Sequence, residues 1–244
     1  MSKENPVALV TDAASFIGPA LTGLYLSEKV KVIAADPSFA DAKAASAFQS
    51  AFPGVFTINQ TSPADTATRA KEHSATFDIL CTGGAYPAGK TPASGLTVAA
   101  TTPFFEKLVI EPLAYLAEVV EDMKAQGYGR IAFITSAGPL GGIPNYTAYA
   151  SARAALNGSV KSLAVELASS GISVNAVAPN FIATEAYFPK ALIDDPATSA
   201  KILSRVPAKR FGEPEEAAQS VAFFTLARSQ FVTGQVLSIS GGWA

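Results

Sequence analysis

Residues 7–18 read VALVTDAASFIG, and this stretch decides the fold of the chain. Its first part, Val7–Thr11, is a short run of apolar and β-branched residues, which predicts a buried strand. A turn follows, and the residues after Gly18 carry a helical pattern. A strand that enters a helix through a tight turn is typical of α/β proteins that bind phosphate groups at the helix N-terminus. We therefore expect the first unit of the chain to be such a strand–turn–helix element.

The turn lacks most of the glycine that a phosphate-binding turn needs for a tight bend and a close approach to a pyrophosphate. Asp12 and Phe16 stand where the first two glycines would fall, and only Gly18 remains. A carboxylate at Asp12 would repel a pyrophosphate by a few kcal/mol at about 4–5 Å. The Phe16 ring would occupy the volume of a cofactor. We expect a filled nucleotide site, with no cofactor bound.

Short β-branched runs alternate with longer helical patterns along the whole chain. The predicted strands are Val7–Thr11, Val30–Ala35, Val55–Ile58, Asp78–Cys81, Arg130–Thr135, Ser173–Val177 and Gln235–Ile239. The predicted helices are Gly18–Glu28, Ala40–Ala51, Ala64–His73, Thr102–Lys124, Thr147–Ser169 and Glu213–Ala227. This alternation indicates right-handed crossovers, a parallel sheet with helices on both faces, and a single domain over residues 1–244.

Composition excludes several classes of function. The chain is 49% hydrophobic and 16% charged with a net charge of −2, and it has no basic cluster interleaved with aromatic residues, so we expect no nucleic-acid partner. It has no signal-peptide pattern and no apolar run of membrane-spanning length, so we expect a cytoplasmic protein with no membrane partner. Cys81 and His73 are the only residues of their types, which argues against a metal site. We interpret Cys81 as a buried strand residue and His73 as a surface residue.

Ligands of a parallel sheet bind beyond the carboxyl ends of its strands, in the loops over residues 11–18, 81–90, 135–149 and 178–206. Ser136 ends the fifth predicted strand, and Tyr149 and Arg153 follow at i, i+4 spacing on one helix face. A guanidinium beside a phenol lowers its pKa, and a shift from about 10 to about 8 takes about 2.7 kcal/mol. Tyr149 would then be a usable general base, and Ser136 could hydrogen-bond a substrate oxygen.

The order of these residues and of several short motifs is similar to the short-chain dehydrogenase/reductase superfamily. The motifs are NAVAP at Asn175–Pro179, RFGEPEE at Arg210–Glu216, TGQ at Thr233–Gln235 and the pair Gly241–Gly242. The resemblance covers almost the whole chain. It implies a Rossmann-like doubly wound sheet of seven parallel strands with helices on both faces, in a single domain.

The departures from that superfamily resemble the halohydrin dehalogenases, a cofactor-independent branch that keeps a Ser–Tyr–Arg triad. Arg153 replaces the usual lysine, Asn180 follows Pro179 in place of glycine, and Thr82–Ala85 replaces an Asn-Asn-Ala-Gly turn. The resemblance implies conversion of vicinal halohydrins to epoxides plus halide, reversible with cyanide, azide or nitrite. It also implies a homotetramer and no metal.

The same resemblance assigns roles to particular residues. The catalytic residues are Ser136, Tyr149 and Arg153. The halide-binding residues are Phe16, Pro179, Asn180, Phe181 and Ile182. We expect the substrate-binding residues to be Tyr86, Pro87, Gly138, Ile143, Tyr146 and Tyr187.

Two other interpretations stay open. One is an NAD(P)-dependent short-chain dehydrogenase/reductase with a degenerate glycine turn, in which Asp36 at the end of the second strand would bind the adenine ribose. The other is a catalytically inactive sensor or scaffold of the same fold. Asp12, Phe16 and Arg153 oppose the first, and the presence of both Ser136 and Tyr149 opposes the second.

Overall fold

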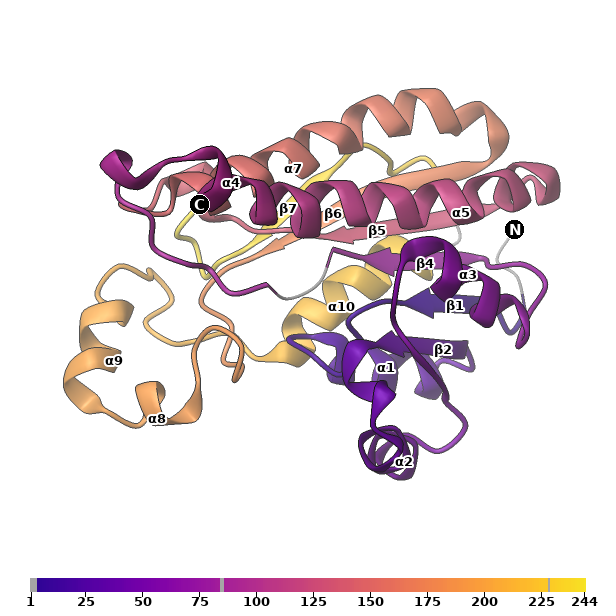
Figure 1. Ribbon diagram of the computed structural model, residues 1–244, viewed down its shortest axis with the longest axis horizontal. Coiled ribbons are helices and arrows are strands. Elements are labelled where there is room, and N and C mark those ends of the chain that lie inside the picture. Colours follow the sequence, from indigo (N-terminus) through magenta and orange to yellow (C-terminus); the bar gives the residue numbers. More distant parts are fainter. Residues whose placement is uncertain (1–3, 84–85, 228) are drawn as a thin grey trace.

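The computed structural model describes residues 4–83, 86–227 and 229–244. Seven parallel strands form one sheet in the order β3-β2-β1-β4-β5-β6-β7 (Figure 1), which confirms the expected single-domain, Rossmann-like, doubly wound fold. The strands are β1 Val7–Val10, β2 Lys31–Asp36, β3 Phe56–Asn59, β4 Ile79–Thr82, β5 Gly129–Ile134, β6 Ile172–Pro179 and β7 Val236–Ile239. Strands β5 and β6 are buried along their whole length, as expected for central strands covered on both faces.

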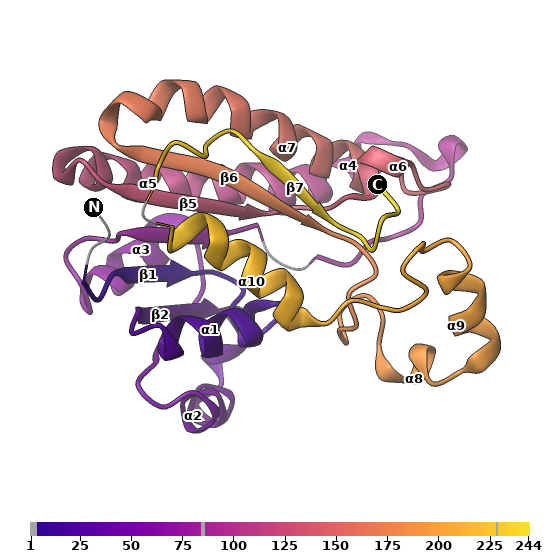
Figure 2. The same ribbon diagram turned by 180° about the vertical axis from the view of Figure 1, so that it is seen from behind.

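Helices cover the sheet in two layers (Figures 1 and 2). One layer holds α1 Gly18–Ser27, α2 Ala42–Ala51 and α10 Pro214–Thr225, and the other holds α3 Pro63–Lys71, α4 Val98–Phe105, α5 Glu111–Gln126 and α7 Thr147–Leu167. Each layer has its own apolar core against the sheet. Short 3-10 turns occur at Pro37–Ala40, Ala93–Gly95 and Ala168–Ser170. All of the predicted strands and five of the six predicted helices end within two residues of the observed bounds.

The prediction of one continuous helix over Thr102–Lys124 is wrong, because this stretch is interrupted. A π-helical turn, η3 Glu106–Ile110, separates α4 from α5. Pro112 has no N–H to continue the ladder, and the N–H of Glu111 donates to the carbonyl of Glu106, five residues back. The wide turn places Lys107 and Glu111 over the carboxyl end of β1, so this irregular segment has a consequence for the site.

The segment between β6 and α10, expected to be a loop, contains two helices. It contains the short helix α8 Lys190–Ile193 and then α9 Pro196–Leu203, which project beyond the carboxyl end of the sheet (Figures 1 and 2). Asp195 caps α9 by accepting a hydrogen bond from the N–H of Thr198, and Pro196 occupies its first turn. This Asp-Pro pair is a helix-start signal that the sequence carried. Another short helix, α6 Gly138–Gly141, follows β5.

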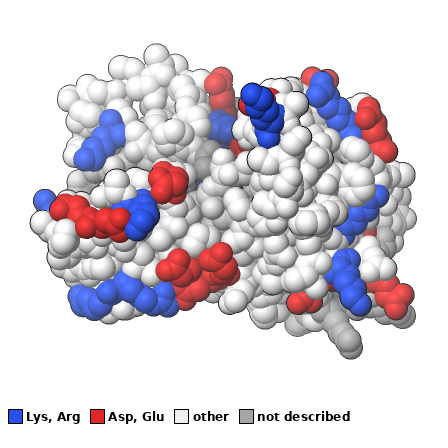
Figure 3. All heavy atoms as spheres, turned by 90° about the horizontal axis from the view of Figure 1, so that it is seen from below, with Lys and Arg blue, Asp and Glu red and all other residues white. Residues whose placement is uncertain are grey.

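Charge is dispersed over the face of the molecule that Figure 3 shows. Figure 3 shows acidic and basic side chains in small mixed groups around a broad uncharged area, without a field of one sign. Within residues 4–83, 86–227 and 229–244, no helix is long and apolar enough to cross a membrane. The same ranges contain no group of three His, Cys, Asp or Glu residues placed to hold a metal ion.

Candidate active site

Tyr149 and Arg153 meet on the buried face of α7. Arg153 Nε–H donates to Tyr149 Oη at 3.2 Å, and both side chains are almost completely buried. Burial alone would raise the pKa of Tyr149, but the Arg153 charge, the Arg153 hydrogen bond and a hydrogen bond from Ser136 outweigh it and leave the pKa below 10. The phenol is therefore poised to lose its proton.

Arg153 is held by the ends of two strands as well as by its own helix. Its Nη1 donates to the carbonyl oxygens of Gly83, at 2.7 Å, and Ile134, at 3.0 Å. Gly83 has a φ of +103°, and a Cβ there would lie 2.7 Å from the Ile134 oxygen. Only glycine fits this close approach. The two carbonyls fix the guanidinium at the carboxyl ends of β4 and β5, where a lysine would offer a single point of charge.

Ser136 lies just beyond β5 and faces α7. It is buried, and its Oγ accepts a hydrogen bond from the N–H of Gly138 at 3.0 Å, which leaves its hydroxyl proton free to be donated. A hydrogen bond from Ser136 is one of the causes that lower the pKa of Tyr149. The structure therefore brings Ser136, Tyr149 and Arg153 together, as the sequence spacing predicted.

One cavity of about 540 Å³ opens over these hydroxyls. Its lining includes Ser136 and Tyr149, all five residues assigned to halide binding, and Ile143, Tyr146 and Tyr187 from the predicted substrate set. Arg153 is buried and does not line the cavity. Gly138, Tyr86 and Pro87 do not line it: Gly138 supports Ser136, and the Tyr86 ring packs edge-on against Phe104, which in turn packs against Tyr149. Gly84 and Ala85, in the predicted Thr82–Ala85 turn, lie outside the described residues.

The predicted halide end of the cavity has an unusual backbone. Phe16 has a φ of +53° and Phe181 a φ of +58°, the left-handed region that favours glycine. The Phe16 ring meets the Tyr187 ring edge-on at 5.1 Å between centroids, and Phe181 meets the Trp243 ring at 5.4 Å. Non-glycine residues held in this region cost of order 1 kcal/mol each and persist where surrounding contacts fix them. The two rings thus form a firm apolar wall.

Asn180 adds a polar group to that wall. Its Oδ1 accepts a hydrogen bond from the N–H of Phe181 at 2.9 Å, which orients the amide. The Nδ2 atom is buried and has no hydrogen-bond partner among the residues that the structure describes. A buried donor without a partner is costly, so this amide is a candidate hydrogen-bond donor to a ligand.

Three cations line the same cavity and were not found from the sequence. They are Lys90, Lys201 and Arg205, all exposed, and the Arg205 guanidinium lies 5.9 Å from the Trp243 ring centre. No carboxylate lines the cavity within the described part of the chain. Lys201 and Arg205 belong to α9 and the turn after it, so recognising that helix would have placed them here.

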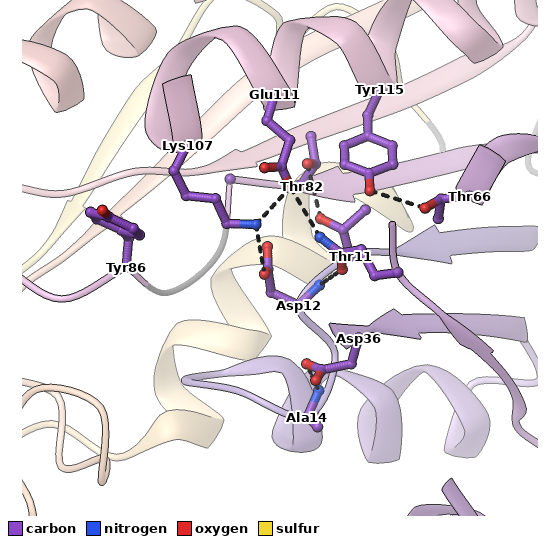
Figure 4. Close-up of polar contacts among 12 residues, drawn as sticks. Thr11, Asp12, Ala14, Asp36, Thr66, Thr82, Tyr86, Lys107, Glu111 and Tyr115 are labelled. Atoms are coloured by element: carbon purple, nitrogen blue, oxygen red, sulfur yellow. Dashed lines mark hydrogen bonds and ion pairs between the residues drawn. The ribbon is translucent and has the colours of Figure 1, made fainter. Parts of the chain in front are cut away.

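Side chains fill the turn after β1, as expected from the missing glycines. Asp12 has a φ of +51° and is buried. Its carboxylate lies 3.4 Å from Lys107 Nζ, which also binds Glu111 at 2.6 Å (Figure 4). Burial raises the pKa of Asp12, and Lys107 opposes the rise. Burial disfavours the Lys107 ammonium, but the two carboxylates outweigh it and raise the pKa of Lys107.

The groups around this turn satisfy one another. The N–H of Asp12 donates to Gln60 Oε1 at 2.7 Å, and the Gln60 amide donates to Glu111. Asp36 accepts hydrogen bonds from the N–H of Ala14, at 2.9 Å, and from both the N–H and the hydroxyl of Ser38 (Figure 4 shows the Ala14 contact). Gly18 is required here because a Cβ would lie 2.4 Å from the Ala13 oxygen.

Cys81 and His73 lie away from the cavity lining. Cys81 is fully buried in β4, and burial raises the pKa of its thiol to about 12, so it is not an activated nucleophile. His73 is half-buried and its ring stacks near Phe56, with centroids 4.9 Å apart. Cys81 is the buried strand residue that the sequence predicted.

Known proteins resemble the chain over its whole length. The family model described as enoyl-(acyl carrier protein) reductase matches residues 13–244. The 3-oxoacyl-(acyl-carrier-protein) reductase FabG of Escherichia coli (strain K12) is 34% identical over 249 residues, covering 99% of this chain and 98% of its own.

Two solved structures resemble it closely as well. One, a dehalogenation enzyme, is 36% identical with a TM-score of 0.95 and covers 100% of both chains. The other is a halohydrin dehalogenase (HheC) bound to ethyl (2S)-oxiran-2-ylacetate, 28% identical with a TM-score of 0.89, covering 97% of this chain and 96% of its own.

Proposed function

The chain belongs to the short-chain dehydrogenase/reductase superfamily, and we propose that it is a halohydrin dehalogenase, which converts vicinal halohydrins to epoxides and halide without a nucleotide. One observation carries the proposal. Asn180, whose buried amide donor has no partner among the described residues, lines the same cavity as a phenol with a lowered pKa. A base at one side and an anion site at the other suit the departure of a halide.

The reaction is an intramolecular displacement. Ser136 and Tyr149 bind the substrate hydroxyl, and Tyr149, ionised beside Arg153, takes its proton. The substrate oxygen then forms a bond to the neighbouring carbon as the carbon–halogen bond breaks, and the halide leaves with the bonding electron pair. The proton passes from Tyr149 to solvent, so the products are epoxide, halide and a proton. Positioning and charge placement lower the barrier.

The halide would leave toward Phe16, Asn180 and Phe181. An amide N–H and the positive edges of aromatic rings favour a large, weakly hydrated anion, and an apolar wall removes competing water. The cavity volume of about 540 Å³ is suited to a small halohydrin. Because each step is reversible, a small anion such as azide, cyanide or nitrite at this position would open an epoxide held by Ser136 and Tyr149.

The nucleotide chemistry of the superfamily does not fit the residues present. A dinucleotide needs a glycine turn that admits its pyrophosphate and a free carboxylate for its ribose. Here the turn carries the Asp12 carboxylate and the Phe16 ring, and the Asp36 carboxylate already accepts three hydrogen bonds from Ala14 and Ser38. These contacts support a mechanism that uses no nicotinamide.

Nucleotide-free protein incubated with 1,3-dichloro-2-propanol tests the proposal. Chloride and epoxide should appear in equal amounts, and Tyr149→Phe should slow the formation of both by about 10²–10⁴-fold while the circular dichroism spectrum stays unchanged. Chloride release that keeps the wild-type rate in Tyr149→Phe would overturn the assignment of the base.

The second candidate is an NAD(P)-dependent reductase. The 34% identity to FabG over nearly the full length of both chains favours it. It would use the same Ser136 and Tyr149 on a carbonyl substrate. It requires that Asp12 and Phe16 move out of the turn, so binding of NADPH to the purified protein would distinguish it.

A further inference from the structure

The Tyr187 side chain makes more polar contacts than a wall of a substrate cavity needs. Its hydroxyl accepts hydrogen bonds from Arg153 Nη2, at 3.3 Å, and from the N–H of Tyr86, at 3.1 Å. It donates to the carbonyl oxygen of Tyr86 at 3.0 Å. Its ring also meets the Phe16 ring edge-on at 5.1 Å. One phenol therefore joins the segments that follow β1, β4 and β6 to the guanidinium on α7.

Arg153 therefore donates hydrogen bonds to two phenols, those of Tyr149 and Tyr187. Its Nε holds Tyr149, its Nη2 holds Tyr187, and its Nη1 is fixed by the carbonyls of Gly83 and Ile134. The rigid guanidinium fork has no further freedom to rotate when all three nitrogens are engaged. Loss of the Tyr187 hydroxyl would remove one of the contacts that orient the guanidinium relative to Tyr149.

The pKa values of the two phenols are shifted in opposite directions from the ordinary tyrosine value. Burial raises the pKa of Tyr187 to about 12, although the Arg153 charge opposes the rise. Burial would raise the pKa of Tyr149, but the Arg153 charge and the Arg153 hydrogen bond outweigh burial and lower it. When the environments of two titratable groups push their pKa values apart, one group can ionise as a base while the other stays protonated. Tyr187 remains protonated where Tyr149 ionises.

We propose that Tyr187 is a positioning residue, whose hydroxyl fixes the Arg153 guanidinium in the orientation in which it binds the Tyr149 phenol. The inference rests on the proposed function for its catalytic meaning. The contacts of Arg153 with the two phenols, and the different pKa values of those phenols, are properties of the free protein. They can be tested without any substrate.

The test is an ultraviolet titration of tyrosinate in wild type, Tyr149→Phe and Tyr187→Phe. The difference between wild type and Tyr149→Phe isolates the Tyr149 phenol. In Tyr187→Phe the midpoint of the Tyr149 phenol should rise by about one unit, a tenfold change, because the guanidinium that stabilises the tyrosinate is held less firmly. An unchanged midpoint would overturn the proposal.

Tyr25→Phe is the matched control. Tyr25 is a buried phenol with hydrogen-bonding contacts to Cys81 and Thr225 in the opposite core, outside the cavity lining. Its loss should lower the melting temperature and leave the Tyr149 midpoint where it was. If the Tyr149 midpoint shifted equally in Tyr25→Phe, the effect of Tyr187→Phe would reflect general loosening of the fold. That result would contradict the proposal.

Two further measurements keep the proposal falsifiable. In an Arg153→Lys background, which lacks the fork, Tyr187→Phe should shift the midpoint much less, and a full shift there would show that Tyr187 does not act through Arg153. If Tyr187→Phe does not fold, wild type and Tyr149→Phe still decide. A low-pKa phenol that survives in Tyr149→Phe would belong to Tyr187 and would refute the division of roles.

Failure of the proposed function would give a different result. Absence of chloride release together with the predicted titrations would remove the dehalogenation and keep the role of Tyr187. With chloride release present, Tyr187→Phe should lower kcat/KM mainly on the acid side of the pH profile, and recovery at higher pH is expected because Tyr149 still ionises there. A uniform loss at all pH values would contradict the positioning role.

Discussion

The Lys107 ammonium lies 3.4 Å from the Asp12 carboxylate and links the π-helical turn between α4 and α5 to the turn after β1. Asp12 stands where a phosphate-binding turn would have glycine, and it keeps the positive φ that glycine would adopt. The chain has therefore retained the backbone of a phosphate turn while placing its own anion there. On the other side of Asp12, Lys107 also forms an ion pair with Glu111, so the three side chains make one charged cluster (Figure 4).

Lys107→Met should lower the free energy of unfolding by about 1–3 kcal/mol at neutral pH, because Asp12 is left buried without its ion pair. Burial already raises the pKa of Asp12 in the folded protein. A raised carboxyl pKa favours the folded state at low pH and penalises it as pH rises. The difference between variant and wild type should therefore shrink on acidification, as measured by urea unfolding across pH.

Lys124→Met is the control for that experiment. Lys124 pairs with Glu121 on the exposed surface of α5, at 2.8 Å, and exposed pairs of this kind contribute little. A loss of stability in Lys107→Met no larger than in this control would show that Asp12 does not depend on Lys107.

The pH dependence of dehalogenation should follow Tyr149. The base must be ionised to accept the substrate proton, so kcat/KM should rise with pH and level off above a pKa that lies below 10. Tyr149→Phe should lose about 10²–10⁴-fold of activity, the usual contribution of a positioned base. Steady-state rates over a range of buffers measure both. A rising limb that persists in Tyr149→Phe would assign the base elsewhere.

Asn180→Asp should weaken chloride binding at least about tenfold, because a carboxylate replaces a buried unpartnered amide donor of the wall and repels the anion. The sole tryptophan, Trp243, packs against Phe181, so its fluorescence reports on this part of the cavity. Gln49→Glu, an exposed amide-to-acid change on α2, controls for net charge and should bind chloride as wild type does. Equal chloride affinity in all three proteins would exclude Asn180 as the halide donor.

Epoxide opening by an anionic nucleophile should depend on salt. Lys90, Lys201 and Arg205 line the cavity without a carboxylate among the described lining residues, and exposed charge raises the local concentration of anions. The kcat/KM for azide should therefore fall as an inert salt is added, while that for a neutral halohydrin changes little. Substitution of the three cations by glutamine should flatten the azide response; a response that keeps its slope would locate the attraction elsewhere.

Most of the fold could be predicted from the sequence because its signals are local. Buried β-branched runs and helical periodicity carry the alternation that specifies a parallel sheet, and each predicted strand is present. The break at Glu106–Ile110 was missed because a π turn has nearly the same apolar pattern as the helix it interrupts. Its local mark, Pro112, is also compatible with a simple bend.

The triad could be predicted because its members have fixed spacing on one helix and one strand end. The contacts between distant segments could not. The Asp12–Lys107 pair joins residues 95 positions apart, and the Tyr187–Arg153 bond depends on how the segment after β6 folds back. Tyr86 and Gly138 were predicted as substrate contacts because they lie in the right loops, but loop position does not reveal which side chains support a neighbour.

Two assays on one nucleotide-free preparation test the central claim most directly. The first adds 1,3-dichloro-2-propanol alone, and the second adds a 3-oxoacyl thioester with NADPH. We expect chloride and epoxide in equal amounts in the first assay and no oxidation of NADPH in the second. Oxidation of NADPH without chloride release would contradict the account and show that the side chains in the turn after β1 admit a nucleotide.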